Sequence, residues 1–296
     1  MNKSKLGITI ILSILTITLF LGCITDEPTN NIEYKKNTFY VDIKGSTNFS
    51  SIQEAIDAAP NNNTIFILSG HYIENLHINK SLTIIGENVH TTIIDGNETD
   101  DTIIIDNNSV IISNCTIINS SKDGNDAGIH INSEYVIIKN NIISNNNCGI
   151  YTNRASYNNI HNNTFKLNTG YGLYAYSSSN NMKVIDNSFF LNDCGLRVKG
   201  SQNCEIIRNI FNNNSKGMYF CCGARSNIVY HNTFSNHSTW NADDQVGSNE
   251  WNNMTEGNYW DDYDGVDNDK DGIGDEPYTV SPDRGIKDFF PLMNPL

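Results

Sequence analysis

Positive charge is scarce in this chain. Its 296 residues include 19 Lys and Arg against 33 Asp and Glu, which gives a formal net charge of −14. Nucleic-acid binding depends on clustered Lys and Arg that contact phosphates, so this composition argues against a nucleic-acid partner. The length fits one elongated domain with further segments at its two ends.

A regular cysteine framework is also absent. The seven cysteines include no CxxC pair, although Cys221 and Cys222 are adjacent. Cys148 and Cys194 fall at equivalent places two repeats apart, which is about 9–10 Å at strand spacing and too far for a disulfide. Most of the cysteines are therefore expected to be small buried side chains. A thiolate metal site at Cys204, Cys221 and Cys222 is the alternative.

The chain lacks a leucine-rich pattern and long runs of helix formers, yet its central part repeats. An Asn-x-Phe or Asn-x-Ile phrase recurs, and its last residue is spaced by 26, 22, 24, 22 and 23 residues. A Gly-aliphatic pair recurs at steps of 21, 23, 23 and 22 residues. Helical repeats are longer than this. Because the repeats are rich in β-branched residues and Asn, with strand alternation, the period predicts an all-β parallel β-helix.

Each coil of this solenoid is expected to contain three short strands. In the coil 149–168 they fall at 149–152, 158–161 and 164–167, and turn-forming residues separate them. Equivalent residues of successive coils should then stack about 4.8 Å apart. Each buried side chain in such a column should stabilise the fold by about 1.5–3 kcal/mol.

Four columns can be read from the sequence. The three inward apolar columns are Ile112, Ile138, Ile160, Val184, Ile206 and Val229; Ile117, Ile143, Phe165, Phe189, Phe211 and Phe234; and Ile129, Ile150, Leu173, Leu196 and Met218. The polar column is Cys115, Asn141, Asn163, Asn187, Asn209 and Asn232. Asn tolerates left-handed backbone and bonds neighbouring main chain, so this column predicts an amide ladder at a corner.

The N-terminus has the features of a targeting segment. Residues 1–23 begin with lysines and contain an uncharged apolar run that is short for a membrane span but suits a signal peptide. Phe20-Leu21-Gly22-Cys23 resembles the lipobox of prokaryotic lipoproteins, although it lacks the usual Leu three places before the Cys. The resemblance implies cleavage before Cys23 and a lipid on its sulfur, and residues 24–38 would then be a polar tether. We therefore expect an exported protein, lipid-anchored at the outer face of the cytoplasmic membrane or the cell surface.

Residues 39–96 are expected to hold an N-terminal cap and the first coils. Ser51-Ile52-Gln53-Glu54 has the form of a helix capping box, and Pro60 ends the apolar helical face that follows it. An amphipathic helix would cover the apolar core at the open end of the solenoid.

This opening resembles a known family. The segments 49–60, 70–76 and 82–86 resemble the start of pectin-lyase-like right-handed β-helix proteins, which pectin methylesterases share with NosD-type proteins. The repeats are expected to fill residues 97–238. Gly257-Asn258-Tyr259-Trp260-Asp261-Asp262-Tyr263, followed by 267–277 and 288–292, resembles the closing segment of NosD-like surface proteins of archaea and bacteria. Residues 239–296 are expected to form an irregular acidic C-terminal cap, with its tryptophans over the end of the core.

The C-terminal segment also contains a pattern typical of calcium loops. Carboxylates alternate at Asp267, Asp269 and Asp271, and Gly272 follows where a sharp turn is needed. The remaining ligands would be the carbonyl of Ile273 and the carboxylate of Asp275. The pattern resembles EF-hand-like and thrombospondin-type loops, except that Tyr278 stands where an EF-hand has its bidentate Glu. The sequence therefore predicts a structural Ca²⁺ ion that fixes the cap.

No catalytic constellation is evident. Carboxylates are sparse on the outward positions of the repeats, which hold Asp186, Asp193 and Glu205. Asp186 and Glu205 fall in different columns, whereas glycosidases need a close pair of carboxylates. Asp100-Asp101 and Asp243-Asp244 lie in expected loops without a base nearby in sequence. Motifs of polygalacturonases, pectin methylesterases and alginate epimerases are not found. A polysaccharide lyase or hydrolase is the alternative.

The favoured interpretation is therefore a non-catalytic surface protein that binds or displays polysaccharide. Tyr151, Tyr174 and Tyr219 are expected in one outward column, interrupted by Arg197, and could form a platform for sugar rings. A second alternative follows from the resemblance to NosD proteins, which assist copper-site assembly. Copper(I) prefers clusters of Cys, Met and His. The sequence supports that role poorly, because His161 and His231 fall three coils apart and the other histidines are scattered.

Overall fold

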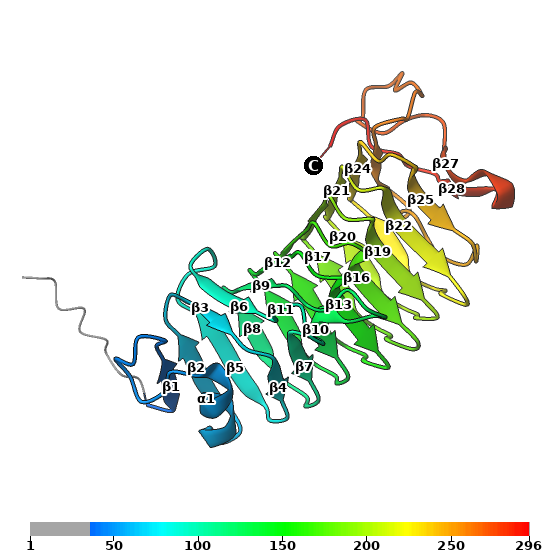
Figure 1. Ribbon diagram of the computed structural model, residues 1–296. Helices are drawn as coiled ribbons and strands as arrows, with labels where there is room; N and C mark the ends of the chain where they lie inside the picture. Colours follow the sequence, from blue (N-terminus) through cyan, green and yellow to red (C-terminus); the bar gives the residue numbers. More distant parts are fainter. Residues whose placement is uncertain (1–35, 296) are drawn as a thin grey trace, which may run out of the picture. The chain divides into compact units, whose positions relative to one another are not determined.

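The computed structural model describes residues 36–295, which form three parallel β-sheets wound from successive coils (Figure 1). In spatial order, sheet A contains β1 (Thr38–Val41), β2 (Asn63–Ile67), β5 (Leu82–Gly86), β8 (Ile111–Ser113), β11 (Ile137–Lys139), β14 (Asn159–His161), β17 (Lys183–Ile185), β20 (Glu205–Ile207) and β23 (Ile228–Tyr230). Sheet B contains β3 (Gly70–Ile73), β6 (Thr92–Asp95), β9 (Thr116–Ile118), β12 (Ile142–Ser144), β15 (Thr164–Lys166), β18 (Ser188–Phe190), β21 (Ile210–Asn212), β24 (Thr233–Ser235) and β26 (Tyr259–Trp260). Sheet C contains β4 (Leu76–Ile78), β7 (Ile103–Ile105), β10 (Ala127–Ile131), β13 (Cys148–Asn153), β16 (Tyr171–Tyr176), β19 (Cys194–Lys199), β22 (Lys216–Cys221) and β25 (Trp240–Asp244). The predicted all-β, right-handed parallel β-helix is confirmed.

The apolar columns stack in the predicted register. Ile138 pairs with Ile160 in sheet A, and Leu173 pairs with Leu196 in sheet C. In sheet B the rings of Phe165 and Phe189 lie parallel, with centroids 4.6 Å apart and planes at 5°. The following Phe pairs repeat this geometry at 4.8 and 4.9 Å. The spacing of strands therefore sets the spacing of the rings.

The recurring glycines make room for these rings. A Cβ atom on Gly172 would lie 2.6 Å from the carbonyl oxygen of Gly195 and 2.7 Å from Cδ1 of Phe189. Both distances are shorter than a carbon atom tolerates, so the glycine phrase and the phenylalanine phrase of the repeat depend on each other. This explains why both keep one period.

The predicted amide ladder runs along the corner between sheets A and B. Each Asn side chain accepts a hydrogen bond from the backbone N–H of the equivalent residue in the coil before, and donates to main-chain carbonyls. Asn187, for example, accepts from the N–H of Asn163 at 2.9 Å and donates to the carbonyl of Ile160 at 2.8 Å. Cys115 begins the ladder by donating its N–H to Asn141, and Asn258 extends it past Asn232.

A second ladder, which the sequence analysis missed, runs along the corner between sheets B and C. It consists of Asn146, Asn168, Asn192 and Asn214, each buried and bonded to the next. Its period equals that of the first ladder, so the same reading of the sequence could have found it.

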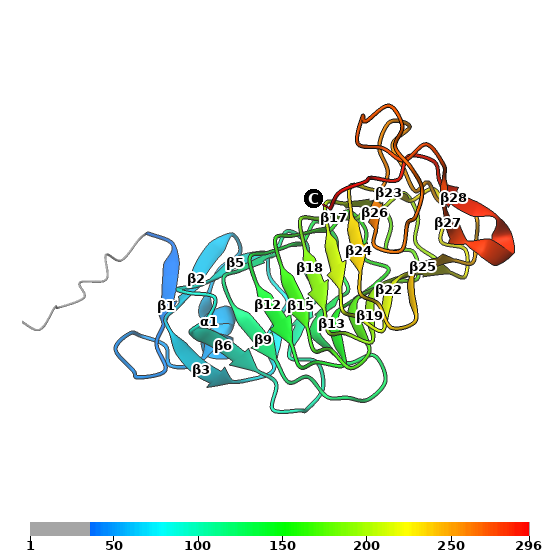
Figure 2. The ribbon, with the colours of Figure 1, turned by 90° about the horizontal axis from the view of Figure 1, so that it is seen from above.

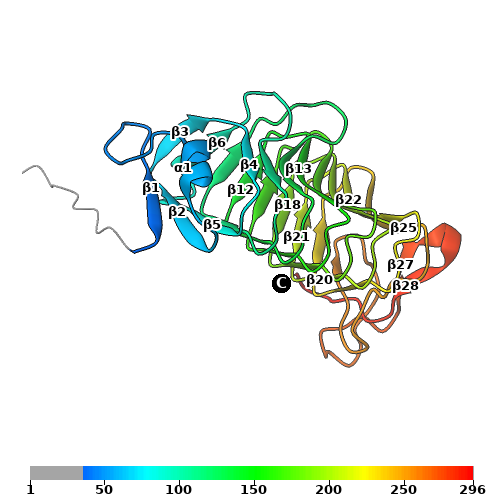
Figure 3. The same ribbon diagram turned by 90° about the horizontal axis from the view of Figure 1, so that it is seen from below.

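The N-terminal cap is the helix α1 (Ile52–Ala58), which covers the end of the core beside β1, β2 and β4 (Figures 2 and 3). Its apolar face is buried, and the Ser51 hydroxyl accepts from the N–H of Glu54, as expected. The other half of the expected capping box is not formed by Glu54. The carboxylate of Glu74 instead accepts from the N–H groups of Ile52 and Gln53, at 2.9 and 3.0 Å.

The solenoid continues further than predicted. Strands β25 and β26 extend sheets C and B beyond residue 238, where the repeat was expected to end. The ring stack continues from Phe234 to Trp260 at 4.5 Å and from Trp260 to Tyr278 at 4.2 Å. Trp251 is buried beside them, whereas Trp240 is half-buried on the outer side of sheet C. Two of the three tryptophans therefore close the core.

The last segment ties this end together. A separate antiparallel pair, β27 (Tyr278–Ser281) and β28 (Ile286–Asp288), flanks the 3-10 helix η1 (Pro282–Arg284). The buried carboxylate of Asp288 accepts from the N–H of Asn258 at 2.7 Å and from Nε1 of Trp260 at 3.0 Å. Burial raises the pKa of Asp288 to about 6, against the hydrogen bonds that favour its charged form.

The ladder leads to a test of stability. We expect Asn187→Ala to lower the free energy of unfolding by about 3 kcal/mol, because it leaves buried backbone groups of two coils without partners. The control is Asn212→Ala, on the outward side of β21, where side-chain bonds to Ser235 and to the exposed Asn213 are lost and the cost should be about 1 kcal/mol. Urea unfolding followed by circular dichroism measures both. If both variants lost the same free energy of unfolding, the ladder would stabilise the fold no more than a surface hydrogen bond does.

Candidate functional site

One continuous column of side chains crosses the outer side of sheet C. Backbone pairing places its members one coil apart, from β4 to β25. The column is His77, Ile104, His130, Tyr151, Tyr174, Arg197, Tyr219 and Asp243. The predicted register of the three tyrosines, with Arg197 between the last two, is therefore correct.

The exposure of the tyrosines differs from the expectation. Only 6% of Tyr151 and 4% of Tyr174 is accessible, because they form a second apolar cluster with Ala127 and Cys148. Tyr171 and Tyr176 pack against this cluster, with the Tyr171 ring 4.7 Å from that of Tyr174. Burial raises the pKa of Tyr151 to about 12 and that of Tyr174 further. These two rings do not form an open platform, whereas Tyr219 stays half-buried.

Beyond Tyr174 the same face is hollowed into a groove of about 360 Å³. Its lining comes from β16, β19, β22 and β25 and from the residue after β25. These residues are Tyr171, Cys194, Arg197, Lys216, Tyr219, Trp240, Asp243 and Gln245. A second hollow of about 450 Å³ shares Asp243 and Gln245 with it and is otherwise lined by Ser281 to Arg284. We call the first of these the sheet C groove.

Arg197 lies among the aromatic rings of this groove. Its guanidinium carbon is 5.0 Å from the centroid of Tyr174 and 5.4 Å from those of Tyr171 and Tyr219. It donates to the hydroxyl oxygen of Tyr171 at 2.5 Å and to Sγ of Cys221 at 3.6 Å. Trp240 extends the aromatic wall, with its ring centroid 5.9 Å from that of Tyr219.

A histidine and a carboxylate meet in the same column, nearer the N-terminal end. Nδ1 of His130 lies 2.7 Å from the carboxylate of Asp101, and the other carboxylate oxygen accepts from the N–H of Ala127. The ring of His130 packs edge-on against Tyr151, and its Nε2 is buried without a partner. No base stands near Asp101 in the sequence, but the winding of the chain brings His130, 29 positions away, beside it.

The sparse carboxylates on the repeats are ion-paired. Asp186 binds Arg208 at 2.7 Å, Asp193 binds Lys216 at 3.3 Å, and Glu205 binds Lys183 at 3.4 Å. Each pair joins neighbouring coils on the surface. These carboxylates therefore form surface ion pairs between coils.

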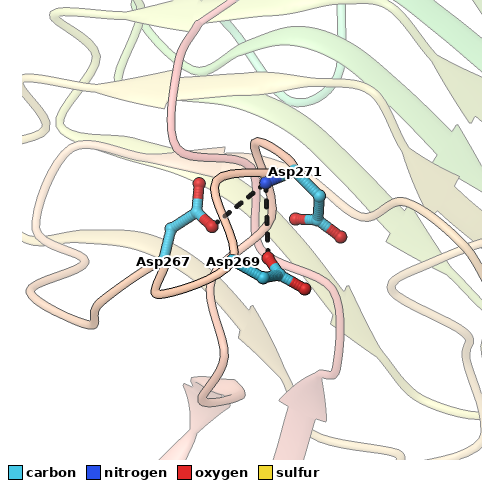
Figure 4. Close-up of side chains that lie close together, drawn as sticks. All are labelled: Asp267, Asp269 and Asp271. Carbon is cyan, nitrogen blue, oxygen red and sulfur yellow. Dashed lines mark hydrogen bonds between the residues drawn. The ribbon is translucent and has the colours of Figure 1, made fainter.

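The predicted calcium ligands are only partly brought together. Oxygen atoms of Asp267, Asp269 and Asp271 lie within 4.8 Å of one another (Figure 4). The N–H of Asp271 bonds both Asp267 and Asp269, and Gly272 has a positive φ of 92°, as the sharp turn requires. The carboxylate of Asp275 instead accepts from the N–H of Asn268 at 3.0 Å.

Ile273, the fourth predicted ligand, follows Asp271 after the turn at Gly272. Its own N–H donates to the carboxylate of Asp271 at 2.8 Å, and the residue pairs antiparallel with Leu292. The loop is therefore attached to the last residues of the chain.

The cysteines do not form the alternative metal site. Cys204 lies buried directly before β20, where its Sγ contacts the carbonyl of Ser179, and it is not grouped with Cys221 and Cys222. Burial raises the pKa of Cys115, Cys148, Cys194 and Cys204 to about 12, which keeps these thiols neutral. Among the described cysteines only Cys222 is exposed.

The predicted signal peptide and lipobox, and most of the predicted tether, fall in residues 1–35, which lie outside the described residues. Within residues 36–295, no helix has the length and apolar character that a membrane crossing requires.

Solved structures resemble this fold at low identity. Pectate lyase Pel9A aligns with a TM-score of 0.50 at 14% identity, over 74% of this chain and 81% of its own. Carrot pectin methylesterase gives 0.43 at 13%, over 72% and 82%. XylC in complex with xylose gives 0.48 at 16%, over 60% and 36%. The chain spans 36% of XylC and 52% of the ORF18 protein of Geobacillus virus E2. At these identities the likeness concerns the fold alone.

No curated protein matches the chain. A family model does, over residues 29–265, and its description is "Periplasmic copper-binding protein (NosD)". The periplasmic description agrees with export. Because this match covers most of the chain and every strand of the three parallel sheets, the chain belongs to the NosD family.

Proposed function

We propose that this protein binds polysaccharide along the sheet C groove and does not chemically alter it. The observation that carries the proposal is an aromatic-walled groove on one face of a regular solenoid, with Tyr219 and Trp240 half-buried in it. Ligand sites are typically lined by aromatic side chains with a few polar groups that fix orientation. A row of equivalent positions one coil apart also suits a ligand that repeats.

The binding surface proposed here differs from the platform expected from sequence. Tyr151 and Tyr174 are buried and do not line the groove, so the contact with a sugar falls to Tyr219 and Trp240. The neighbouring donors and acceptors are those of Arg197, Lys216 and Asp243. Strands β19, β22 and β25 hold these side chains in place.

Variants of the two rings test this proposal. We expect the double variant Tyr219→Ala, Trp240→Ala to lose at least about tenfold in affinity on a polysaccharide panel, since it removes the aromatic wall. The control is Tyr157→Ala, an exposed tyrosine stacked on Tyr135 at 5.3 Å outside the groove, and it should bind normally. Affinity gel electrophoresis with the wild-type protein and each variant provides the measurement.

Two results would contradict the proposal. If the double variant bound polysaccharide as tightly as the wild-type protein, the sheet C groove would not be the binding site. Release of reducing or unsaturated sugar ends by the wild-type protein would instead support the alternative of a polysaccharide lyase or hydrolase.

The copper role in the family description is not supported by the described donor groups. Copper(I) sites use clustered Cys, Met or His. In residues 36–295, the one group of three His, Cys, Asp or Glu with adjacent ligand atoms is the oxygen-donor set of Asp267, Asp269 and Asp271. These residues do not fit copper, and we assign no copper chemistry to them.

The same carboxylates do suit calcium, and we propose a structural Ca²⁺ there. Asp267, Asp269 and Asp271 converge, and further ligands would come from the Ile273 carbonyl and from Asp275 after it turns from Asn268. Three carboxylates this close repel one another, and a divalent cation removes that repulsion. The ion would fix the loop whose Gly272 carbonyl accepts from the N–H of Met293.

Calcium should therefore raise the melting temperature. At a concentration about one hundred times the dissociation constant, the gain of about 2.7 kcal/mol corresponds to about 5 °C or more for a domain of this size. Calorimetry in Ca²⁺ and in EDTA measures the shift. Asp269→Asn should abolish it, whereas Asp283→Asn in η1 should retain it. A wild-type protein with the same melting temperature in both buffers would disprove the site.

We also propose that a lipid on Cys23 anchors the protein at the outer face of the membrane. The support is the lipobox-like sequence together with the periplasmic description of the family. Metabolic labelling with a fatty acid should mark the wild-type protein and the Cys222→Ser control, but not Cys23→Ser. Label retained in Cys23→Ser would rule out this anchor.

A further inference from the structure

Arg197 is a half-buried cation in the sheet C groove without an anionic partner. In the part of the chain that the structure describes, no carboxylate lies within 4.0 Å of its guanidinium. The carboxylate that lines the groove and the one beside its Lys216 are both engaged elsewhere. Asp193 pairs with Lys216 at 3.3 Å, and Asp243 accepts from Ser281 at 3.0 Å and from Gln245 at 3.3 Å.

The contacts that Arg197 does make leave its charge uncompensated. Its partners are a phenol oxygen, a thiol and three tyrosine rings, all of which are formally neutral. Cation–π contacts offset only part of the cost of removing a guanidinium from water. Its Nε is buried with no hydrogen-bond partner. The two terminal nitrogens of the guanidinium carry four N–H groups. One of these donates to Tyr171 and one to Cys221, so two of them remain free.

The surrounding groups are mostly donors. Because the oxygen of Tyr171 accepts from Arg197, its O–H proton remains to be donated. Lys216 adds an ammonium group, and its single bond to Asp193 leaves further N–H groups. In a chain of net charge −14, this groove therefore combines two cations with one carboxylate that is already hydrogen-bonded.

We infer that the sheet C groove takes a carboxylate-bearing sugar, that is, a uronate unit of an acidic polysaccharide. The carboxylate binds the free N–H groups of Arg197 and the hydroxyl of Tyr171, while the sugar ring lies against Tyr219 and Trp240. A planar guanidinium matches a carboxylate in shape and charge. This inference rests on the proposed polysaccharide binding and adds the class of ligand.

The test compares sugars that differ only in charge. Calorimetry is done on the wild-type protein with oligogalacturonates and alginate oligomers, each alongside its methyl-esterified or carboxyl-reduced form. We expect the acid forms to bind at least about tenfold more tightly than the neutral forms. Arg197→Gln should remove that difference. Arg197→Lys should keep part of it, because the charge stays but the planar fork is lost.

The matched control is Arg208→Gln. Arg208 is an arginine of the same solenoid that is exposed and paired with Asp186, and its variant should discriminate between acid and neutral forms like the wild-type protein. Melting temperatures and circular dichroism establish that each variant is folded.

The outcomes separate this inference from the function on which it rests. Equal binding of acid and neutral forms, or binding of neutral sugars only, overturns the inference and leaves polysaccharide binding in place. Preference for sulfated over carboxylated sugars overturns the carboxylate assignment. Absence of binding to every sugar in the panel overturns both proposals.

Discussion

The structure depends on one constraint, which is that each residue of a coil lies over its equivalent in the next. The two asparagine ladders enforce this constraint at the corners. There each side-chain amide forms hydrogen bonds with backbone groups of neighbouring coils. A shift by one residue would leave those groups unpaired in a buried place. The phenylalanine stack and the glycines beside it impose the same register from the inside. Corners and core therefore specify one alignment together.

The same constraint acts on the outer side of sheet C and has a different result there. Inside, stacking like residues buries them against the core. On the outer side, stacking sets large polar and aromatic residues side by side. Tyr151 and Tyr174 are buried there because they pack together and Tyr171 and Tyr176 pack against them. The face opens where Arg197 interrupts the aromatic run. A fold shared by many proteins does not determine a function. The proposed ligand therefore rests on the side chains around Arg197 and not on the fold.

The sequence predicted the fold better than the site, for a physical reason. Columns such as Phe165 to Phe234 follow from the period alone, since stacking needs only a constant coil length. The burial of Tyr151 depends on how neighbouring side chains fold over it, and a period does not contain that information. The same holds for Glu74 at the start of α1 and for His130 beside Asp101, which meet partners 22 to 29 residues away through local loop geometry. The acidic loop could be predicted because its carboxylates are close in sequence. The orientation of Asp275, which accepts from the N–H of Asn268, could not be predicted.

The placement of the tryptophans has a consequence for spectroscopy. All three of them, Trp240, Trp251 and Trp260, belong to the last coils, and two are packed against the end of the ring stack. Their emission therefore reports on one end of the molecule only. A solenoid in which each coil contacts mainly its neighbours can fray from either end. Loss of α1 and the first coils would be invisible to tryptophan fluorescence while circular dichroism records it, so a difference between the two signals would reveal at which end unfolding begins.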